Sequence, residues 1–496
     1  MLDHIKNEAN ITYTENGARA YASTGSDCLD FFTSAGAIRR RTDDEIISRF
    51  VRAYTEDPDS AMKLLFYTRD VRGGLGERRV FRTIMNWLAD NEPESVRKNI
   101  RYIAEYGRYD DLLSLLGTRC EADALDEIRT CFAKDMNALE NGGEMSLLGK
   151  WLPSVNASSR QTVINGKKVA RSLGMDDASY RRALTALRAR IRIIENSLRE
   201  KDYSFDYEKQ PSRAMKKYRK AFIRNDRERY MNFISAVSEG KSVMHADNVA
   251  PYELVNQFID YRYYGSTRSF MRDLTNDEKD SLNAAWASLP EYGTEGDALA
   301  IVDTSGSMYI ETDPMPAAVA LSLGLYLADH NKGAFRNHFI EFSRKPQLIE
   351  LKGKTFADRL RYAASFSEVA NTNMEAVFDL ILSAAVRNSV PQNELPARLV
   401  IISDMQFDQC VDDADMTVFE NAKLKYKENG YRLPQVVFWN VAARHSDQPV
   451  KKDERGVLLV SGTTPRLFSM VADGTATPYS FMMDILKSKR YENISA

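Results

Sequence analysis

The sequence predicts two fold classes in one chain, an irregular all-α helical-repeat domain followed by a doubly wound α/β domain. Apolar residues recur at helical spacing from about residue 42 to about residue 285. Beyond the stretch LPEYGTEGD (289–297), short continuous apolar runs alternate with helical segments, which is typical of parallel strands buried on both faces. A chain of 496 residues is also too long for one core. We therefore expect domains at residues 1–288 and 289–496.

A short hairpin is predicted near the N-terminus, before the helices begin. The stretch ITYTENGARAYAS contains two strand-like runs around Asn16-Gly17, a dipeptide typical of a type I′ turn. Helical periodicity then covers residues 46–54, 80–88 and 180–198, and breaks such as RGGLG, YGRYDD and SEGK separate the helices. These patterns predict an irregular stack of antiparallel helices.

The second part consists of strands and helices in alternation. The predicted strands are DALAIVD, HFIEFS, PQLIEL, RLVIISD, QVVFWNVA and GVLLVSG, and the predicted helices are AAVALSLGLYLAD, FADRLRYAASF, MEAVFDLILSAAVRN and VFENAKLKYKENG. HFIEFS and PQLIEL are expected to pair as a hairpin. Such folds bind ligands beyond the carboxyl ends of their parallel strands, so polar residues at those ends are candidates for a site.

The stretch AIVDTSGSM crowds oxygen-bearing side chains at one such strand end. Asp303 ends the strand, and Ser305 and Ser307 lie in a tight loop that a glycine allows. One carboxylate and two hydroxyls suit Mg²⁺ or Mn²⁺, but they are too few to fill an octahedral site. Two other strand ends offer the remaining oxygen ligands, Thr372 at the opening of a helix and Asp404 after VIIS. The sequence therefore predicts a metal site built from these five residues.

Other interpretations of this stretch explain less. An aspartic protease needs Asp-Thr/Ser-Gly, which Ser305 interrupts, and a Ser–His triad lacks a suitable histidine. A strand end whose Asp and Ser cap the next turn does not explain Thr372 and Asp404 at the matching places. The sequence near the site offers no obvious general base or nucleophile, so we expect binding and no catalysis. Because we expect Asp303 at a solvent-facing strand end, Asp303→Ala should leave the fold largely intact.

The composition is typical of a cytoplasmic protein without zinc or disulfides. The four cysteines are scattered with no C-x-x-C pair, and the five histidines never fall at ligand spacing. The longest apolar run, roughly residues 317–328, is too short to cross a bilayer. The start MLDHIKNEAN is acidic and polar, unlike a signal peptide. We therefore expect a cytoplasmic location and no membrane partner.

The net charge of −2 conceals a basic segment. Residues 160–229 contain 20 Lys or Arg against 9 Asp or Glu, a net charge of about +11. Such a segment favours a polyanionic partner, although a solvated helical face has the same composition. The glycines of GGLG, earlier in the chain, lack the Lys-Ser/Thr of a Walker motif and a preceding strand. They suit the end of one helix and the opening of another turn, although the arginines around them could contact phosphates.

Cations interleaved with aromatic residues define the candidate RNA contacts. YRRALTALRARIR spaces arginines along one predicted helix whose Leu184, Leu187 and Ile191 face the core. KKYRKAFIR interleaves cations with Tyr218 and Phe222, which suits single-stranded RNA, although two aromatics four residues apart also suit a buried helix face. The candidate cations, with those around GGLG, are Arg72, Arg78, Arg79, Arg181, Arg188, Arg192, Lys216, Lys217, Arg219, Lys220 and Arg224.

Several phrases resemble one known family, over nearly the whole chain. EYGRYDDLLSLL, LGKWLPSVNASSRQ, YRRALTALRARIRIIE and PSRAMKKYRKAFIRND are similar to a bacterial, viral and plant family whose helical domain is related to the TROVE module of the Ro autoantigen. The D-x-S-x-S motif, the later Thr and the later Asp resemble the metal-ion-dependent adhesion site of von Willebrand factor A domains. The resemblance implies that Ser305, Ser307 and Thr372 coordinate the metal, and that Asp303 and Asp404 hold it partly through water.

The same resemblance implies a HEAT-like, ring-forming helical domain closed by a Rossmann-like von Willebrand factor A domain. It also implies that the N-terminal hairpin and the first helices touch the region after Leu289. Ro proteins bind structured small RNAs on a basic outer surface and single-stranded RNA ends in the ring. We therefore expect a non-catalytic RNA-binding protein that carries Mg²⁺ or Mn²⁺. The alternative is a protein-interaction module whose metal grips an acidic side chain of a partner, without RNA; an enzyme is a more distant third.

Overall fold

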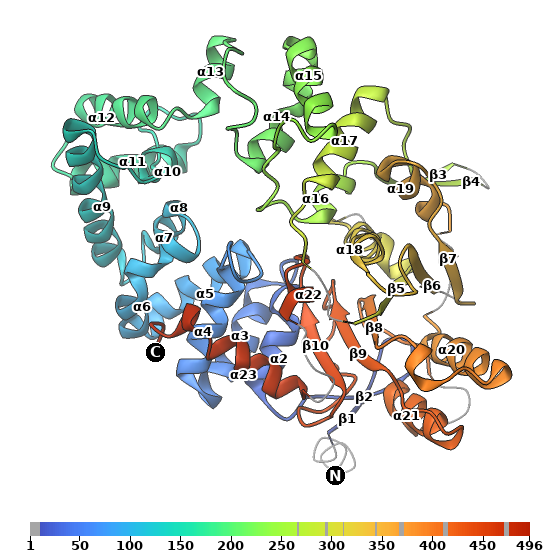
Figure 1. The fold of residues 1–496 in the computed structure, drawn as a ribbon. Coiled ribbons are helices and arrows are strands. Elements are labelled where there is room, and N and C mark those ends of the chain that lie inside the picture. Colours follow the sequence, from blue (N-terminus) through green and yellow to red (C-terminus); the bar gives the residue numbers. More distant parts are fainter. Residues whose placement is uncertain are drawn as a thin grey trace. The chain divides into compact units, whose positions relative to one another are not determined.

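Figure 1 shows the fold as a computed structural model, which describes residues 10–264, 267–292, 296–310, 312–342, 345–366, 372–409, 415–470 and 476–496. For residues 260–264 and 267–271 the description covers the backbone alone. The chain forms two compact units. The sheet unit consists of Met1–Arg41 with Tyr207–Ile485, and the helical unit consists of Thr42–Asp206 with Leu486–Ala496.

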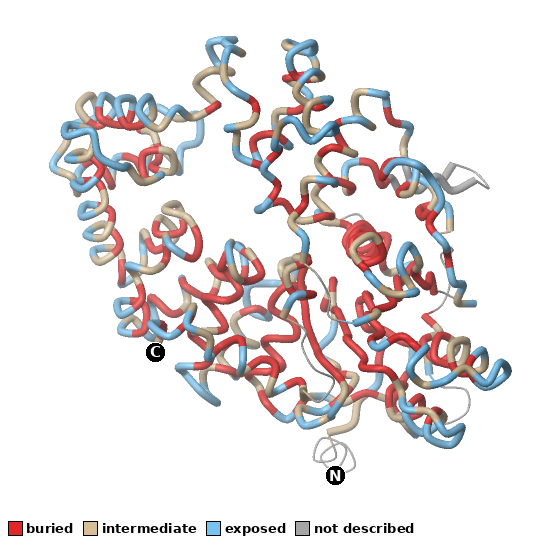
Figure 2. Tube along the Cα trace, in the orientation of Figure 1, coloured by how far each residue is buried: buried red, intermediate tan, exposed pale blue. Residues whose placement is uncertain are grey.

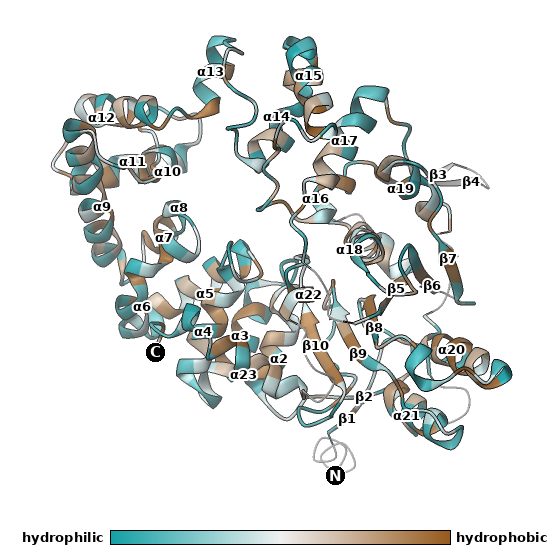
Figure 3. Ribbon diagram, viewed as in Figure 1, coloured by the Kyte–Doolittle hydropathy of each residue, from teal (hydrophilic) through white to brown (hydrophobic). Residues whose placement is uncertain are grey.

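A six-stranded sheet forms the centre of the sheet unit. Its order is β10-β9-β8-β5-β6-β7, and all neighbours are parallel except β6 and β7, which pair antiparallel. The strands are β5 (Ala298–Asp303), β6 (His338–Phe342), β7 (Gln347–Glu350), β8 (Arg398–Ser403), β9 (Gln435–Asn440) and β10 (Val457–Ser461). β10 is mainly brown in Figure 3, as expected of a strand buried on both faces. All six predicted strands are present, and the predicted fold class is confirmed.

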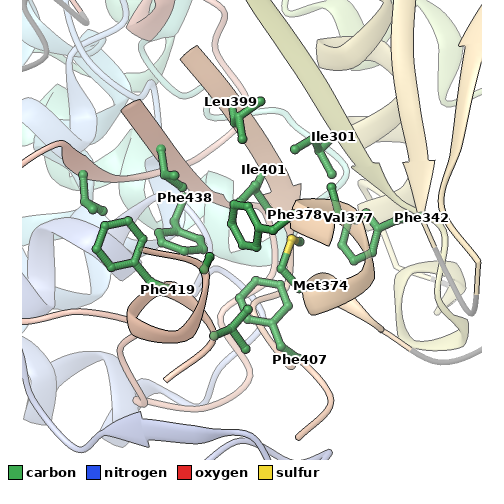
Figure 4. Close-up of a cluster of buried hydrophobic side chains, with 14 of the residues drawn as sticks. Ile301, Phe342, Met374, Val377, Phe378, Leu399, Ile401, Phe407, Phe419 and Phe438 are labelled. Carbon is green, nitrogen blue, oxygen red and sulfur yellow. The ribbon is translucent and has the colours of Figure 1, made fainter. Parts of the chain in front are cut away.

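Helices cover both faces of the sheet. On one face, Phe378 of α20 (Met374–Asn388) and Phe419 of α21 (Val418–Glu428) pack in the apolar cluster of Figure 4, together with Ile301 of β5. Val302, the next residue of β5, points to the opposite face. There α18 (Pro316–His330) is buried along most of its length (Figure 2), and a Cβ at its Gly324 would come within 2.4 Å of Val302 Cγ2.

The N-terminal hairpin and α2 belong to the same unit as the sheet. β1 (Ile11–Tyr13) and β2 (Arg19–Tyr21) pair antiparallel, as predicted, and isolated bridges join the hairpin to Asp408, Thr417 and Gln448. The expected contact between the hairpin and the region after Leu289 is therefore confirmed. The other elements of this unit are α2 (Asp27–Ala35), α14 (Ser212–Asn225), α15 (Arg227–Ser238), α16 (Pro251–Val255), β3 (Ile259–Tyr264), β4 (Thr267–Met271), α17 (Asn276–Ala287), η3 (Gly306–Tyr309), α19 (Phe356–Ala364), η4 (Gln392–Glu394), α22 (Leu467–Met470) and α23 (Pro478–Leu486).

The helical unit is built from amphipathic helices of very different lengths, from four residues in α7 to 21 in α9. In α3, for example, Thr42 and Glu45 form a capping box, and Ile46, Phe50 and Ala53 are buried on one face. The elements are α3 (Asp43–Glu56), α4 (Pro58–Arg69), α5 (Arg78–Asn91), α6 (Pro93–Asn99), η1 (Ile100–Tyr102), α7 (Ile103–Tyr106), α8 (Tyr109–Leu112), η2 (Leu113–Leu115), α9 (Glu121–Asn141), α10 (Leu148–Trp151), α11 (Arg160–Ser172), α12 (Asp177–Arg190), α13 (Ile194–Glu200) and η5 (Lys489–Tyr491).

The division into units differs from the predicted boundary at residues 288 and 289. α16 packs on α18 and α17 packs on α19, so these helices group with the sheet. Conversely, the C-terminal residues group with the helical unit. Arg490 Nε donates to Asp70 Oδ2 at 2.8 Å, and the Tyr491 ring stacks on Tyr106 with centroids 5.7 Å apart.

The predicted continuous helix over 180–198 is wrong. α12 ends at Arg190, and Arg192 takes a left-handed backbone conformation with φ 48° before α13 begins at Ile194. Arg181 and Arg192 therefore do not share one helix, and Ile191 is half-buried. Apolar residues keep their helical spacing across this break because α12 and α13 each bury one face. Within the described residues, none of the helices is both long and apolar enough to span a membrane.

Candidate functional site

The end of β5 holds three of the predicted metal ligands. Asp303 is wholly buried; its Oδ1 accepts from the Ser305 backbone N–H at 2.8 Å and its Oδ2 accepts from Ser403 Oγ at 2.5 Å. The Ser305 and Ser307 hydroxyls lie 3.2 Å apart, where η3 begins. The expectation of a solvent-facing Asp303 is therefore wrong, because the loop after β5 folds back over the strand end.

Asp404 and Thr372 reach the same region from two other elements. Asp404 follows β8, the neighbour of β5, and is 1% exposed. Thr372 is equally buried and stands just before α20, and its carbonyl accepts from the Asp408 backbone N–H at 3.0 Å. This hydrogen bond ties the Thr372 segment to the loop after Asp404. Parallel strands end at one sheet edge, which is why residues 100 positions apart in the chain meet there.

The electrostatics of this edge favour a cation. Burial, and next the negative charge of Asp404, raise the pKa of Asp303 to about 7. The hydrogen bonds from Ser403 and Ser305 act in the opposite direction and only partly offset this. A divalent cation held between the two carboxylates would remove the repulsion that raises this pKa.

The donor set fits a hard cation of the Mg²⁺ type. It offers carboxylate and hydroxyl oxygens and no nitrogen or sulfur. In the described part of the chain, no group of three or more His, Cys, Asp or Glu side chains is placed to hold a metal ion. The predicted set contains only two carboxylates, and hydroxyl groups are its other oxygen donors. The role of all five residues as metal ligands stays a prediction.

Sequence reasoning missed several residues at this edge. Arg444, after β9, pairs with Asp404, with Nη2 2.9 Å from Oδ2. Asn16, at the tip of the N-terminal hairpin, donates to the Gln406 carbonyl at 2.7 Å and more weakly to Thr372 Oγ1 at 3.5 Å. Glu341 of β6 is buried and accepts from the Thr304 hydroxyl. An acid inside the apolar strand HFIEF was a signal for Glu341. No local pattern marks Arg444, and the Asn16-Gly17 pattern marks a turn and not a site.

The candidate RNA contacts in the helical unit divide into exposed residues and one half-buried residue, Arg188. Arg188 donates to the Gly149 and Leu152 carbonyls and to Ser154 Oγ at 2.8–3.0 Å, and burial lowers the pKa of its guanidinium. These bonds engage the guanidinium with the 149–154 segment, and its role as an RNA contact stays a prediction. Those with exposed side chains are Arg72, Arg78, Arg79, Arg181 and Arg192.

Some of the exposed arginines are already engaged. Arg72 donates to the Glu105 carbonyl at 2.7 Å, and Arg79 pairs with Asp43 at 2.6 Å. The GGLG turn beside them is structural, because a Cβ at Gly74 would lie 2.0 Å from the Tyr67 carbonyl oxygen. That result supports the helix-ending interpretation of GGLG.

The remaining candidates lie on α14, in the sheet unit. Lys217, Lys220 and Arg224 are exposed, and Lys216 is exposed but pairs with Glu253 at 3.0 Å. Arg219 is only 8% exposed; it donates to Gln257 Oε1 at 2.8 Å, so its prediction as a surface contact is wrong. The two aromatic residues of α14 pack as on a buried helix face, since Phe222 is wholly buried and Tyr218 is half-buried. The basic segment thus contributes separate faces to the two units.

Comparisons with known proteins match nearly the whole length of the chain. The chain is 28% identical over 518 residues to a protein described as uncharacterized protein L728 of Acanthamoeba polyphaga mimivirus, covering 97% of this chain and 88% of that protein. The crystal structure of the Deinococcus radiodurans RO (RSR) protein is similar with a TM-score of 0.40 and 14% identity, covering 90% of this chain and 99% of that one.

Two family models match different parts of the sequence. The model described as domain of unknown function DUF7788 matches residues 297–485. The model described as domain of unknown function DUF2828 matches residues 14–130 and 126–292, which is more than half of the chain. This chain therefore belongs to the DUF2828 family.

Proposed function

We propose that this protein is a non-catalytic binding protein that holds one Mg²⁺ or Mn²⁺ at the carboxyl ends of β5 and β8. The main observation behind this proposal is the pair of buried carboxylates, Asp303 and Asp404. Both lie at one edge of the sheet beside three hydroxyl groups. An ionised Asp303 is costly because it is buried beside the negative charge of Asp404, even though Arg444 pairs with Asp404. A cation with an open coordination position accepts an oxygen of a partner, which is the chemistry of a binding site.

Calorimetry with Mn²⁺ tests this proposal. Wild-type protein is expected to bind one Mn²⁺, and Ser307→Ala is expected to weaken binding because it removes one hydroxyl ligand. Ser365→Ala is the matched control, since Ser365 caps α19 with its hydroxyl on a local carbonyl, Tyr362 O, at 2.7 Å. Equal Mn²⁺ affinity for wild type and Ser307→Ala would remove Ser307 from the site, and no Mn²⁺ binding by wild type would refute the site.

We also propose that the partner is RNA, in single-stranded or small structured form, held through phosphates. The observation that favours RNA is the outer face of α14. Three cations along it, Lys217, Lys220 and Arg224, are exposed within about two turns of helix. A row of cations on a helix contacts a phosphate backbone without reading its sequence.

Charge reversal on α14 tests the RNA proposal. The triple change of Lys217, Lys220 and Arg224 to Glu should weaken binding to all single-stranded RNA sequences alike. It should also flatten the slope of log K against log salt by about 2, at roughly 0.7 per phosphate contact. Reversal of Lys332, Lys352 and Lys354, three exposed lysines elsewhere in the sheet unit, gives the same change in net charge and serves as the control.

The alternative partner is a protein that offers an acidic side chain to the cation, without RNA. The two proposals differ in one measurement. If both triple variants weaken RNA binding equally, the effect reflects net charge alone, and the α14 face is no longer a candidate for the RNA-binding surface. No RNA binding at low salt, together with intact Mn²⁺ binding, leaves the protein partner as the better proposal.

A further inference from the structure

The tip of the N-terminal hairpin lies against the loop that follows Asp404. Thr14 Oγ1 donates to the Phe407 carbonyl at 2.6 Å, and the Glu15 backbone N–H donates to Gln406 Oε1 at 2.7 Å. Asn16 Nδ2 donates to the Gln406 carbonyl at 2.7 Å. These bonds fix the backbone of the tip and leave the Glu15 side chain 48% exposed.

Arg444 connects this tip to the candidate metal site. Its Nη2 lies 2.9 Å from Asp404 Oδ2, and its Nη1 lies 2.9 Å from Glu15 Oε2. The Arg444 side chain is 26% exposed, and its Nε is buried without a hydrogen-bond partner among the described residues. One guanidinium therefore faces a buried carboxylate of the site on one side and an exposed carboxylate on the other.

Arg444 has a donor that suits a second oxyanion. A guanidinium binds carboxylate and phosphate through paired N–H donors. In Arg444 the donor that meets an exposed group is Nη1, paired with Glu15, whereas Nε is buried and has no acceptor among the described residues. A cation bound at Asp404 would also compete with Arg444 for the same carboxylate, because like charges repel. Arg444 would then interact less with Asp404, and its donors would face Glu15 and the solvent.

We propose that Arg444 is a second recognition group of the metal site, which takes an oxyanion, either carboxylate or phosphate, bound jointly by the cation and the guanidinium. Glu15 occupies Arg444 in cis until such a ligand displaces it. The hairpin need not unfold for this exchange, because its tip is anchored by Thr14, Asn16 and the backbone of Glu15. This inference rests on the proposed cation site, and it adds the class of ligand and an intramolecular competitor.

Mn²⁺ titrations of the full chain test the inference, with and without acetate or dimethyl phosphate as the probe. Arg444→Gln is expected to tighten Mn²⁺ binding about threefold to fivefold, the range of a partly exposed ion pair, because a competing cation is removed. It should also abolish the effect of either probe. Glu15→Gln is expected to weaken Mn²⁺ binding by a similar factor without a probe, since Arg444 then pairs more firmly with Asp404. The probe should raise Mn²⁺ affinity more in Glu15→Gln than in wild type. By linkage, this is expected because the probe then binds Arg444 without competition from Glu15.

The outcomes separate this inference from the proposal beneath it. Glu428→Gln, at the exposed end of α21, makes the same charge change away from Arg444 and should leave all titrations unchanged. A larger gain with dimethyl phosphate assigns a phosphate ligand, and a larger gain with acetate assigns a carboxylate. Mn²⁺ binding that neither variant alters, with or without probe, overturns the inference alone. No Mn²⁺ binding by wild type overturns the cation site and the inference together. Glu15→Gln changes an exposed side chain, so its result stands even where Arg444→Gln does not fold.

Discussion

Replacing Asp303 by Asn is expected to stabilise the cation-free protein at high pH. The pKa of Asp303 is about 7 in the folded protein against an ordinary value of 3.8. Above pH 7 the carboxylate is charged in both the folded and the unfolded chain, so its burial costs the whole difference of about 3 units. At about 1.36 kcal/mol per unit this is about 4 kcal/mol. An Asn side chain carries no charge and avoids that cost.

Asp303→Asn also disturbs a buried hydrogen bond. Asp303 Oδ2 accepts from the Ser403 hydroxyl, and an Asn amide placed there would present a donor to a donor unless Ser403 turns. A mismatched buried pair costs about 1–3 kcal/mol, so the net gain at pH 8 is about 1–3 kcal/mol. At pH 5 the wild-type carboxyl is largely protonated when folded, and burial costs only about 1–2 kcal/mol. The gain there is expected to be close to zero.

Urea unfolding of both proteins in EDTA, at pH 5 and pH 8, measures these differences. Repeating the pH 8 titration with Mn²⁺ at a hundred times its dissociation constant should stabilise the wild type by about 2.7 kcal/mol and the variant not at all. If Asp303→Asn lowers the free energy of unfolding by the same amount at pH 5 and at pH 8, then burial of the ionised Asp303 carboxylate does not destabilise the wild type at high pH. Equal stabilisation of both proteins by Mn²⁺ would refute the assignment of Asp303 as a ligand.

Mn²⁺ affinity in calorimetry should rise up to tenfold per pH unit below about 7 and level off above it, because the metal takes the ionised form of Asp303. In the metal-free protein the free energy of unfolding changes with pH in the opposite direction. The stability contributed by the Asp303 carboxyl is full below pH 3.8 and is lost as the pH rises through about 7. Thr372→Val should weaken Mn²⁺ binding by about tenfold or more, and Thr372→Ser should largely keep it, since the hydroxyl is the ligand. Asp111→Ala should cost about 3–5 kcal/mol in urea unfolding, because it leaves Arg69, whose side chain is 2% exposed, without its carboxylate partner. Arg188→Ala should lower the unfolding midpoint and leave the salt dependence of RNA binding unchanged, as its donors hold protein carbonyls.

The sequence by itself determined the elements and the centre of the candidate site. Six strands and their helices were readable because continuous apolar runs and helical periodicity are local consequences of burial on two faces or on one. The carboxyl ends of parallel strands lie at one sheet edge, so Asp303 and Asp404 could be placed together without coordinates. The N-terminal hairpin was readable from Asn16-Gly17, whose turn preference is likewise local.

Only the tertiary structure decided which neighbours these residues have. Local spacing gave Arg188 and Arg219 the same pattern as surface cations. Long-range packing, however, leaves Arg188 half-buried against backbone carbonyls and buries Arg219 against the Gln257 amide oxygen. The grouping of α14–α17 with the sheet, and of the last residues with the helical unit, depends on contacts between segments far apart in the chain. The meeting of Glu15, Asp404 and Arg444 is of the same kind, because an ion pair between three distant segments leaves no periodicity in any of them.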